Sequence, residues 1–141
     1  RNSMRKIIMV GDKEYELGTS AYTPIAYKQQ FGKDYFQDLF SMLQNQSIMS
    51  ELNKLNSDEK ELNEVDISIL SDFDMTFFNR LFWTFAKTAN PHIKPYEQFF
   101  MEMETFPIQE IGPELMEMLN ASMSTKKSQT SQKQLAKKSS Q

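Results

Sequence analysis

The residues that could perform chemistry are few in this chain. The 141 residues include no cysteine and a single histidine, His92, which lies between two prolines in the segment Pro-His-Ile-Lys-Pro. A general base or a metal ligand needs companion side chains, and none stands near His92 in the sequence. We therefore interpret His92 as a histidine of a surface loop. The absence of thiols excludes disulfides, thiolate catalysis and zinc fingers.

Acidic residues gather in two groups that could suggest a carboxylate site. They are Asp58, Glu59, Glu61, Glu64 and Asp66, and then Glu102, Glu104, Glu110, Glu114 and Glu117. Two-metal or glycosidase chemistry requires carboxylates that rigid elements hold inward. These carboxylates alternate with polar residues or fall on outer helix faces, so we interpret them as solvated charge. Residues 11–13, Gly-Asp-Lys, lack the further glycine of a phosphate loop. The sequence predicts no catalytic residue, metal or cofactor, and a protein that is not an enzyme.

Length and charge define the broad class of the chain. The length indicates one domain with a core of its own. The net charge is −3, but five lysines after Glu117 leave the rest with 11 basic and 19 acidic residues, a net −8. An acidic body argues against a phosphate-binding surface on the fold. We expect residues 1–123 to form a helical domain and residues 124–141, rich in Lys, Ser and Gln, to be a disordered tail.

No segment is typical of export or of membrane insertion. We expect no signal peptide, because no apolar stretch follows a basic start at the N-terminus. The densest apolar run, residues 77–89, is interrupted by polar residues and is too short to span a bilayer.

The first elements are signalled by turn and cap residues. Residues 4–10 predict a strand, residues 11–13 a turn, and residues 14–17 a returning strand with Tyr15 and Leu17 on one face. Thr23 is predicted to cap a helix that has Pro24 at its first position and ends at Gly32.

A second helix is predicted after the cap residue Asp34. Its apolar face should hold residues spaced i, i+3, i+4 and i+7. They are Phe36, Leu39, Phe40 and Leu43. Residues 44–66 are rich in Asn, Gln, Ser, Glu and Lys, and we interpret them as an exposed, mobile connection.

The third helix should be the central one. It is predicted from a cap at Asp66 to about Ala89, where Asn-Pro ends it. Its apolar arc is unusually wide, and it comprises Leu70, Phe73, Phe77, Phe78, Leu81, Phe82, Phe85 and Ala89. Pro95 is predicted to open a fourth helix that carries Phe99, Phe100 and Met103, and residues 114–123 to form the last one. The predicted fold is mostly α (α+β): a bundle of four to five helices with a small N-terminal β-hairpin.

Five residues are candidates for partner binding. Trp83 falls off the main apolar stripe beside Arg80, so it either packs beneath the hairpin or another helix, which we favour, or anchors a partner. The chain has ten methionines, which fill irregular cores but also form adaptable binding surfaces. For Leu115, Met118 and Leu119 we weigh core and partner groove equally.

Two blocks of sequence are informative together. They are residues 23–39 (Thr-Pro-Ile-Ala-Tyr-Lys-Gln-Gln-Phe-Gly-Lys-Asp-Tyr-Phe-Gln-Asp-Leu) and residues 81–91 (Leu-Phe-Trp-Thr-Phe-Ala-Lys-Thr-Ala-Asn-Pro). A Tyr-Glu-Gln-Phe-Phe segment, a Pro-Glu-Leu-Met-Glu-Met-Leu segment and a Lys-rich end follow. With the preceding hairpin, this order resembles the tail assembly chaperones of long-tailed (siphovirus-type) phages and prophages of Gram-positive bacteria. The likeness covers about residues 4–127.

The resemblance implies a function in viral morphogenesis. Such chaperones bind the hydrophobic tape measure protein in the host bacterial cytoplasm, help to recruit tail tube subunits, and are absent from the mature virion. Many are made in two forms through a ribosomal frameshift. From the residues themselves we expect a soluble homo-oligomer, because a lone hairpin edge and excess apolar helix surface both favour partners. The alternative is a small helical regulatory protein that binds nucleic acid through its basic C-terminal tail.

Overall fold

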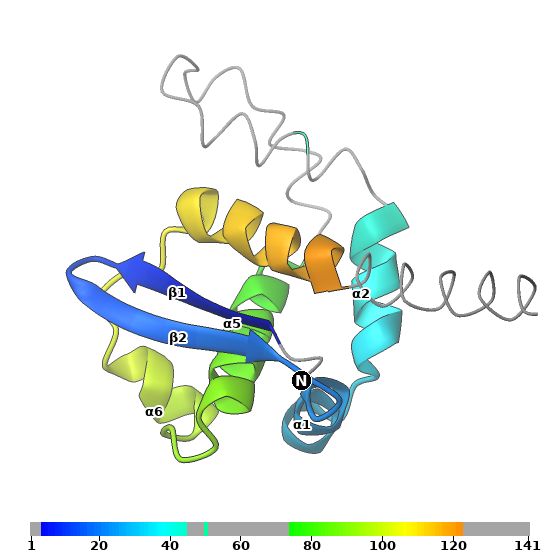
Figure 1. The fold of residues 1–141 in the computed structure, drawn as a ribbon, viewed down its shortest axis with the longest axis horizontal. Coiled ribbons are helices and arrows are strands. Elements are labelled where there is room, and N and C mark those ends of the chain that lie inside the picture. Colours follow the sequence, from blue (N-terminus) through cyan, green and yellow to red (C-terminus); the bar gives the residue numbers. More distant parts are fainter. Residues whose placement is uncertain (1–3, 45–49, 51–73, 123–141) are drawn as a thin grey trace, which may run out of the picture.

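The structure, a computed structural model, describes residues 4–44, 50 and 74–122 (Figure 1). The elements in chain order are β1 (Met4–Val10), β2 (Lys13–Thr19), α1 (Thr23–Phe31), α2 (Tyr35–Gln44), α5 (Thr76–Ala89), α6 (Tyr96–Met101) and a last helix over residues 108–122. This order confirms the predicted fold class, helices with a small N-terminal hairpin. Apart from Gln44 and Ser50, the predicted connection over residues 44–66 lies outside the described residues, and so does the predicted tail over residues 124–141.

The hairpin lies across α5, the central helix (Figure 1). Its strands pair antiparallel with Ile7 opposite Glu16 and Ile8 opposite Tyr15, and Gly11 supplies the left-handed turn residue at φ +66°. Because opposite residues share a face, Ile8, Val10 and Leu17 all point toward the helices and are buried. The predicted hairpin is confirmed, with a second strand three residues longer than the predicted residues 14–17.

The start of α1 differs from the prediction. The helix begins at Thr23 itself, with Tyr22 in the cap position and no side-chain cap hydrogen bond. Thr23 is buried instead, and its Oγ1 lies 3.0 Å from Oγ1 of Thr88 in α5. Thr23 therefore hydrogen-bonds α1 to α5 and does not cap α1. The helix ends as predicted at Gly32, which has φ +69° and donates its N–H to the carbonyl of Lys28.

Helix α2 starts as predicted but buries a different face. The Oδ1 of Asp34 accepts the N–H of Gln37 at 2.9 Å, which is the expected cap. The buried residues are Tyr35, Leu39 and Met42, spaced i, i+4 and i+7, whereas Phe36 and Phe40 are 45% and 50% exposed. The predicted face was therefore wrong in part, because the contact of Tyr35 with Tyr27 of α1 rotates Phe36 outward.

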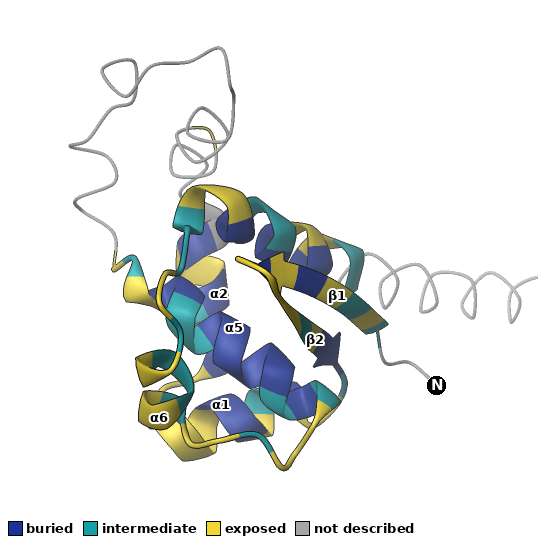
Figure 2. Cartoon of the chain, turned by 90° about the vertical axis from the view of Figure 1, so that its left-hand side faces the viewer, coloured by how far each residue is buried: buried dark blue, intermediate teal, exposed yellow. Residues whose placement is uncertain are grey.

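Helix α5 is central, as predicted, but it is shorter at its N-terminus. It begins at Thr76, whose N–H bonds to the side chain of Asp74 at 3.1 Å, and Asp74 itself is not helical. A start at Asp66 was therefore wrong; Leu70 and Phe73 lie outside the described residues. Buried residues occur on nearly every side of the helix (Figure 2), which follows from its place between the hairpin and the other helices.

The last two helices also differ from the prediction in their limits. Helix α6 follows Pro95 as expected but ends at Met101, short of Met103. The last helix begins at residue 108 and runs through Pro113, although we predicted a start at residue 114. Proline lacks the N–H that would bond to the carbonyl of Gln109, but Gln109 is exposed, so water can satisfy that carbonyl.

Candidate functional site

The residues that the sequence suggested for chemistry can now be located in the structure. Among the described residues, no group of three His, Asp or Glu side chains lies close enough to hold a metal ion. His92 is exposed, as expected for a surface-loop histidine. Glu114 and Glu117 pair with Lys6 of β1. Partial burial by itself lowers the pKa of Lys6, but the hydrogen bonds and charges of these two carboxylates together outweigh it, so the pKa is raised. The acidic group at residues 58–66 lies outside the described residues.

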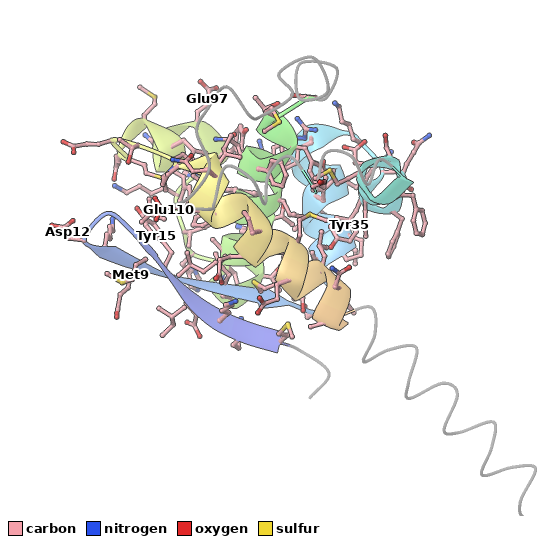
Figure 3. The ribbon with its side chains drawn as sticks, turned by 90° about the horizontal axis from the view of Figure 1, so that it is seen from above. Met9, Asp12, Tyr15, Tyr35, Glu97 and Glu110 are labelled. Carbon is pink, nitrogen blue, oxygen red and sulfur yellow. The ribbon has the colours of Figure 1, made fainter. Side chains whose placement is uncertain are left out.

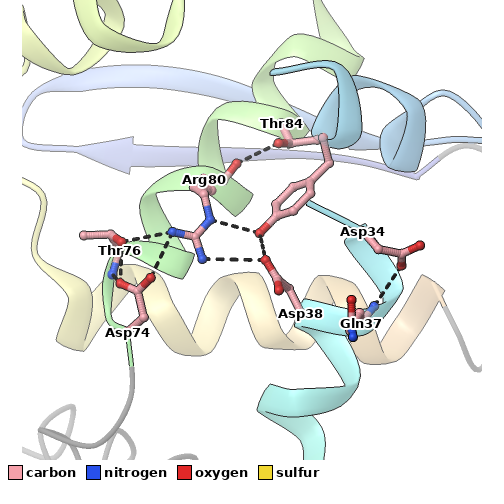
Figure 4. Close-up of polar contacts among 8 residues, drawn as sticks. Asp34, Gln37, Asp38, Asp74, Thr76, Arg80 and Thr84 are labelled. Atoms are coloured by element: carbon pink, nitrogen blue, oxygen red, sulfur yellow. Dashed lines mark hydrogen bonds and ion pairs between the residues drawn. The ribbon is translucent and has the colours of Figure 1, made fainter. Parts of the chain in front are cut away.

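The most connected polar group is the guanidinium of Arg80 (Figure 4). Its Nε donates to the hydroxyl of Tyr27 at 3.0 Å, and that hydroxyl donates to Oδ2 of Asp38 at 2.6 Å. Its Nη1 donates to Oδ2 of Asp74 at 3.2 Å and to Oγ1 of Thr76 at 3.0 Å. Its Nη2 lies 3.7 Å from Oδ2 of Asp38. One side chain of α5 thereby joins α1, α2 and the residues that precede α5.

The electrostatics of this cluster favour the charged forms of Arg80 and Asp74. The hydrogen bond from Thr76 is the largest cause of the lowered pKa of Asp74; burial opposes it, and the hydrogen bond from Arg80 adds to it. Burial raises the pKa of Tyr27, so this phenol stays neutral and can donate to Asp38. The side chain of Arg80 is only 12% exposed. The contacts of Arg80 with Tyr27 and Asp38 are partly buried, while those with Asp74 and Thr76 lie at the surface, and together they can fix the packing of three helices.

Trp83, the first candidate for partner binding, is buried in the core of the chain. It is 4% exposed, and its Nε1 donates to the carbonyl of Lys94 at 3.0 Å. The rings of Phe31 and Tyr96 meet it edge to face at centroid distances of 5.9 and 6.2 Å. It packs between α1 and α6, which is the interpretation that we favoured.

Leu115, Met118 and Leu119 are buried as well. They are at most 2% exposed and belong to the same core cluster as Leu17 and Phe82. In this conformation a partner could reach these three residues, or Trp83, only after the core opens, whereas Arg80 is partly exposed. Partner binding by these five residues stays a prediction.

Large apolar side chains that face solvent lie elsewhere. They are Ile7, Met9, Tyr22, Ile25, Phe36, Phe40 and Met101. Single exposed apolar residues are ordinary, whereas neighbouring ones can mark a contact surface. Two pairs are neighbours on one element: Ile7 and Met9 on β1, and Phe36 and Phe40 on α2, whose rings lie 6.5 Å apart between centroids.

The pair on β1 occupies what we call the outer hairpin face, formed by Arg5, Ile7, Met9, Glu14, Glu16 and Gly18. Figure 3 shows Met9 pointing away from the helices and Tyr15 pointing toward them. Glu16 stands directly across from Ile7, and Glu14 across from Met9. Sequence reasoning missed this surface. Its signal was the unbroken apolar run of residues 7–10, which a two-stranded sheet cannot bury on both faces.

Of the described helices, none is both long and apolar enough to cross a membrane. The chain matches no known protein family, and neither a characterised protein nor a solved structure matches it.

Proposed function

We propose that this protein is a tail assembly chaperone of a long-tailed phage or prophage. In this function it binds the tape measure protein, helps to recruit tail tube subunits, and acts without catalysing a reaction. It works in the host bacterial cytoplasm, as a homo-oligomer, and is absent from the mature virion. The proposal rests on the resemblance carried by residues 23–39 and 81–91.

The observation that most supports a binding function is the placement of apolar side chains. A chaperone that holds its client needs a stable core and apolar surface outside it. Here the aromatic residues of α5 are buried, while apolar residues of β1 and α2 remain in solvent. An exposed apolar surface can cover the apolar stripe of a client helix, and the acidic body keeps the complex soluble by charge repulsion.

Co-expression with the tape measure protein of the same phage tests the proposal. The soluble yield of the tape measure protein should rise, and the two proteins should co-purify. Their complex should survive moderate salt, because apolar burial and not ion pairing would stabilise it.

A truncated chain that ends at residue 123 is the matched control. It lacks the basic tail and should bind the client equally well. If neither chain co-purifies with a soluble tape measure protein at any salt, the proposal is wrong. If only the full chain binds, and only at low salt, the basic tail makes the contact and the nucleic-acid alternative gains support.

A further inference from the structure

The outer hairpin face combines apolar and acidic groups in a defined register. Ile7 is 61% exposed and Met9 is 53% exposed, and each stands across the strand pair from a glutamate. Both glutamates are exposed, and neither pairs with a basic side chain in the part of the chain that the structure describes. The face therefore presents an apolar row on β1 beside an acidic row on β2.

The single basic residue of this face does not neutralise the acidic row. The Nη1 of Arg5 donates to the carbonyl of Thr88, near the C-terminus of α5, at 3.4 Å. To reach it, the guanidinium passes over Gly18, where a methyl group would lie only 2.5 Å from Nη1. A cation at a helix C-terminus is electrostatically favourable. Glu14 and Glu16 are thus left to interact with a partner.

We propose that the outer hairpin face is a docking surface for an amphipathic helix whose apolar stripe is flanked by Lys or Arg. The stripe covers Ile7 and Met9, and the flanking cations lie beside Glu14 and Glu16. The occupant is inferred from charge complementarity, since an acidic partner would place like charges against the two glutamates. This deepens the proposed function, on which it rests, by naming the client segment and the surface that receives it.

Two synthetic peptides test the docking surface. They share one leucine stripe, and one carries lysines along its flanks where the other carries glutamates. Binding to the full chain is measured by fluorescence anisotropy. The Lys-flanked peptide should bind about tenfold more tightly than the Glu-flanked one, which is the difference that one or two well-placed charge contacts produce. Equal affinity for the two peptides would overturn the proposal.

Variants of the chain test whether the peptide binds at the outer hairpin face. The double substitution Ile7→Glu with Met9→Glu should weaken binding of the Lys-flanked peptide at least about tenfold. Ile25→Glu is the matched control, because Ile25 is similarly exposed, at 52%, but belongs to α1 and not to the outer hairpin face. It should change affinity less than about twofold. The double substitution Glu14→Lys with Glu16→Lys should shift the binding preference toward the Glu-flanked peptide.

Folding of each variant is verified by circular dichroism and by the fluorescence of Trp83. If the glutamate variant does not fold, Ile7→Thr with Met9→Thr replaces it, since threonine suits a strand and is still polar. An equal loss of binding in the Ile25 variant, or no loss in the hairpin variants, would refute the site.

Other occupants of the face have their own signatures. Sedimentation that shows a dimer dissociating in the Ile7 and Met9 variant, with peptide binding unchanged, would assign the face to a second copy and overturn the proposal. If the peptides behave as expected but the tape measure protein does not co-purify, the chaperone function alone is wrong. If the tape measure protein co-purifies but the peptides do not discriminate, the docking surface alone is wrong.

Discussion

The hydroxyl of Tyr27 joins two partly buried charged groups, Arg80 and Asp38, so its removal should measure what the Arg80 cluster contributes. Tyr27→Phe keeps the ring, which is fully buried, and deletes one hydrogen bond to Asp38 and one from Arg80. A hydrogen bond to a charged group contributes about 1.5–3 kcal/mol. In the variant, Arg80 and Asp38 can pair directly, because their nearest atoms are only 3.7 Å apart.

This direct pair should recover one of the two lost bonds. We therefore expect Tyr27→Phe to lower the free energy of unfolding by about 1.5–3 kcal/mol, the contribution of one charged hydrogen bond rather than of two. Urea denaturation followed by Trp83 fluorescence and by circular dichroism measures the change. Coincident transitions by the two probes would justify a two-state analysis.

Tyr35→Phe provides the matched control. Tyr35 is also buried, on α2 beside Tyr27, and the structure gives its hydroxyl no hydrogen bond among the described residues. Loss of this hydroxyl should lower the free energy of unfolding by less than about 0.5 kcal/mol. If the two variants are equally stable, the cluster contributes nothing measurable and the reasoning is refuted. A double-mutant cycle with Asp38→Asn should give a coupling of about 0.5–3 kcal/mol.

Three other perturbations test the remaining assignments. Trp83→Ala should lower the free energy of unfolding by about 3–5 kcal/mol, because the side chain fills the core between α1 and α6. Urea denaturation followed by circular dichroism measures this change. A fully stable variant that has lost client binding would instead make Trp83 a partner anchor. The lowered pKa of Asp74 stabilises the fold above about pH 4, and this contribution is lost as the pH falls through the folded-state value. Since the side chain of Asp74 is 55% exposed, Asp74→Asn should lower the free energy of unfolding by about 0.5 kcal/mol or less at pH 7, and by less than that at pH 2. If Asp74→Asn lowered the free energy of unfolding equally at both pH values, this assignment would be contradicted. Removal of residues 125–141 should leave the melting temperature nearly unchanged in calorimetry, and a drop of several degrees would show that the tail packs on the domain.

Local signals in the sequence were enough for several elements. The turn at Gly11, the helix end at Gly32 and the cap at Asp34 were predicted and confirmed. Each depends on the conformation or the hydrogen bond of one residue and its near neighbours, so a short stretch of sequence contains the needed information. The central place of α5 followed from its aromatic residues, which can be satisfied only by burial on most sides.

Other features depended on contacts between residues far apart in the sequence. The outward turn of Phe36 and Phe40 follows from the packing of α2 against α1, not from their spacing alone. The last helix passes Pro113 because its apolar face, which includes Ile111 and Leu115, is buried in the core, and that burial can offset one lost hydrogen bond.

The candidate sites show the same division. Their composition was visible in the sequence: few reactive groups, many aromatic and methionine side chains, and an acidic body. Tertiary structure alone decided which side chains face solvent. Arg80 bonds to residues of α1 and α2, and Trp83 donates a hydrogen bond to the loop before α6. Ile7 and Met9, in contrast, face solvent. The physical reason is that a two-stranded sheet has two faces and the helices of this fold cover only one of them.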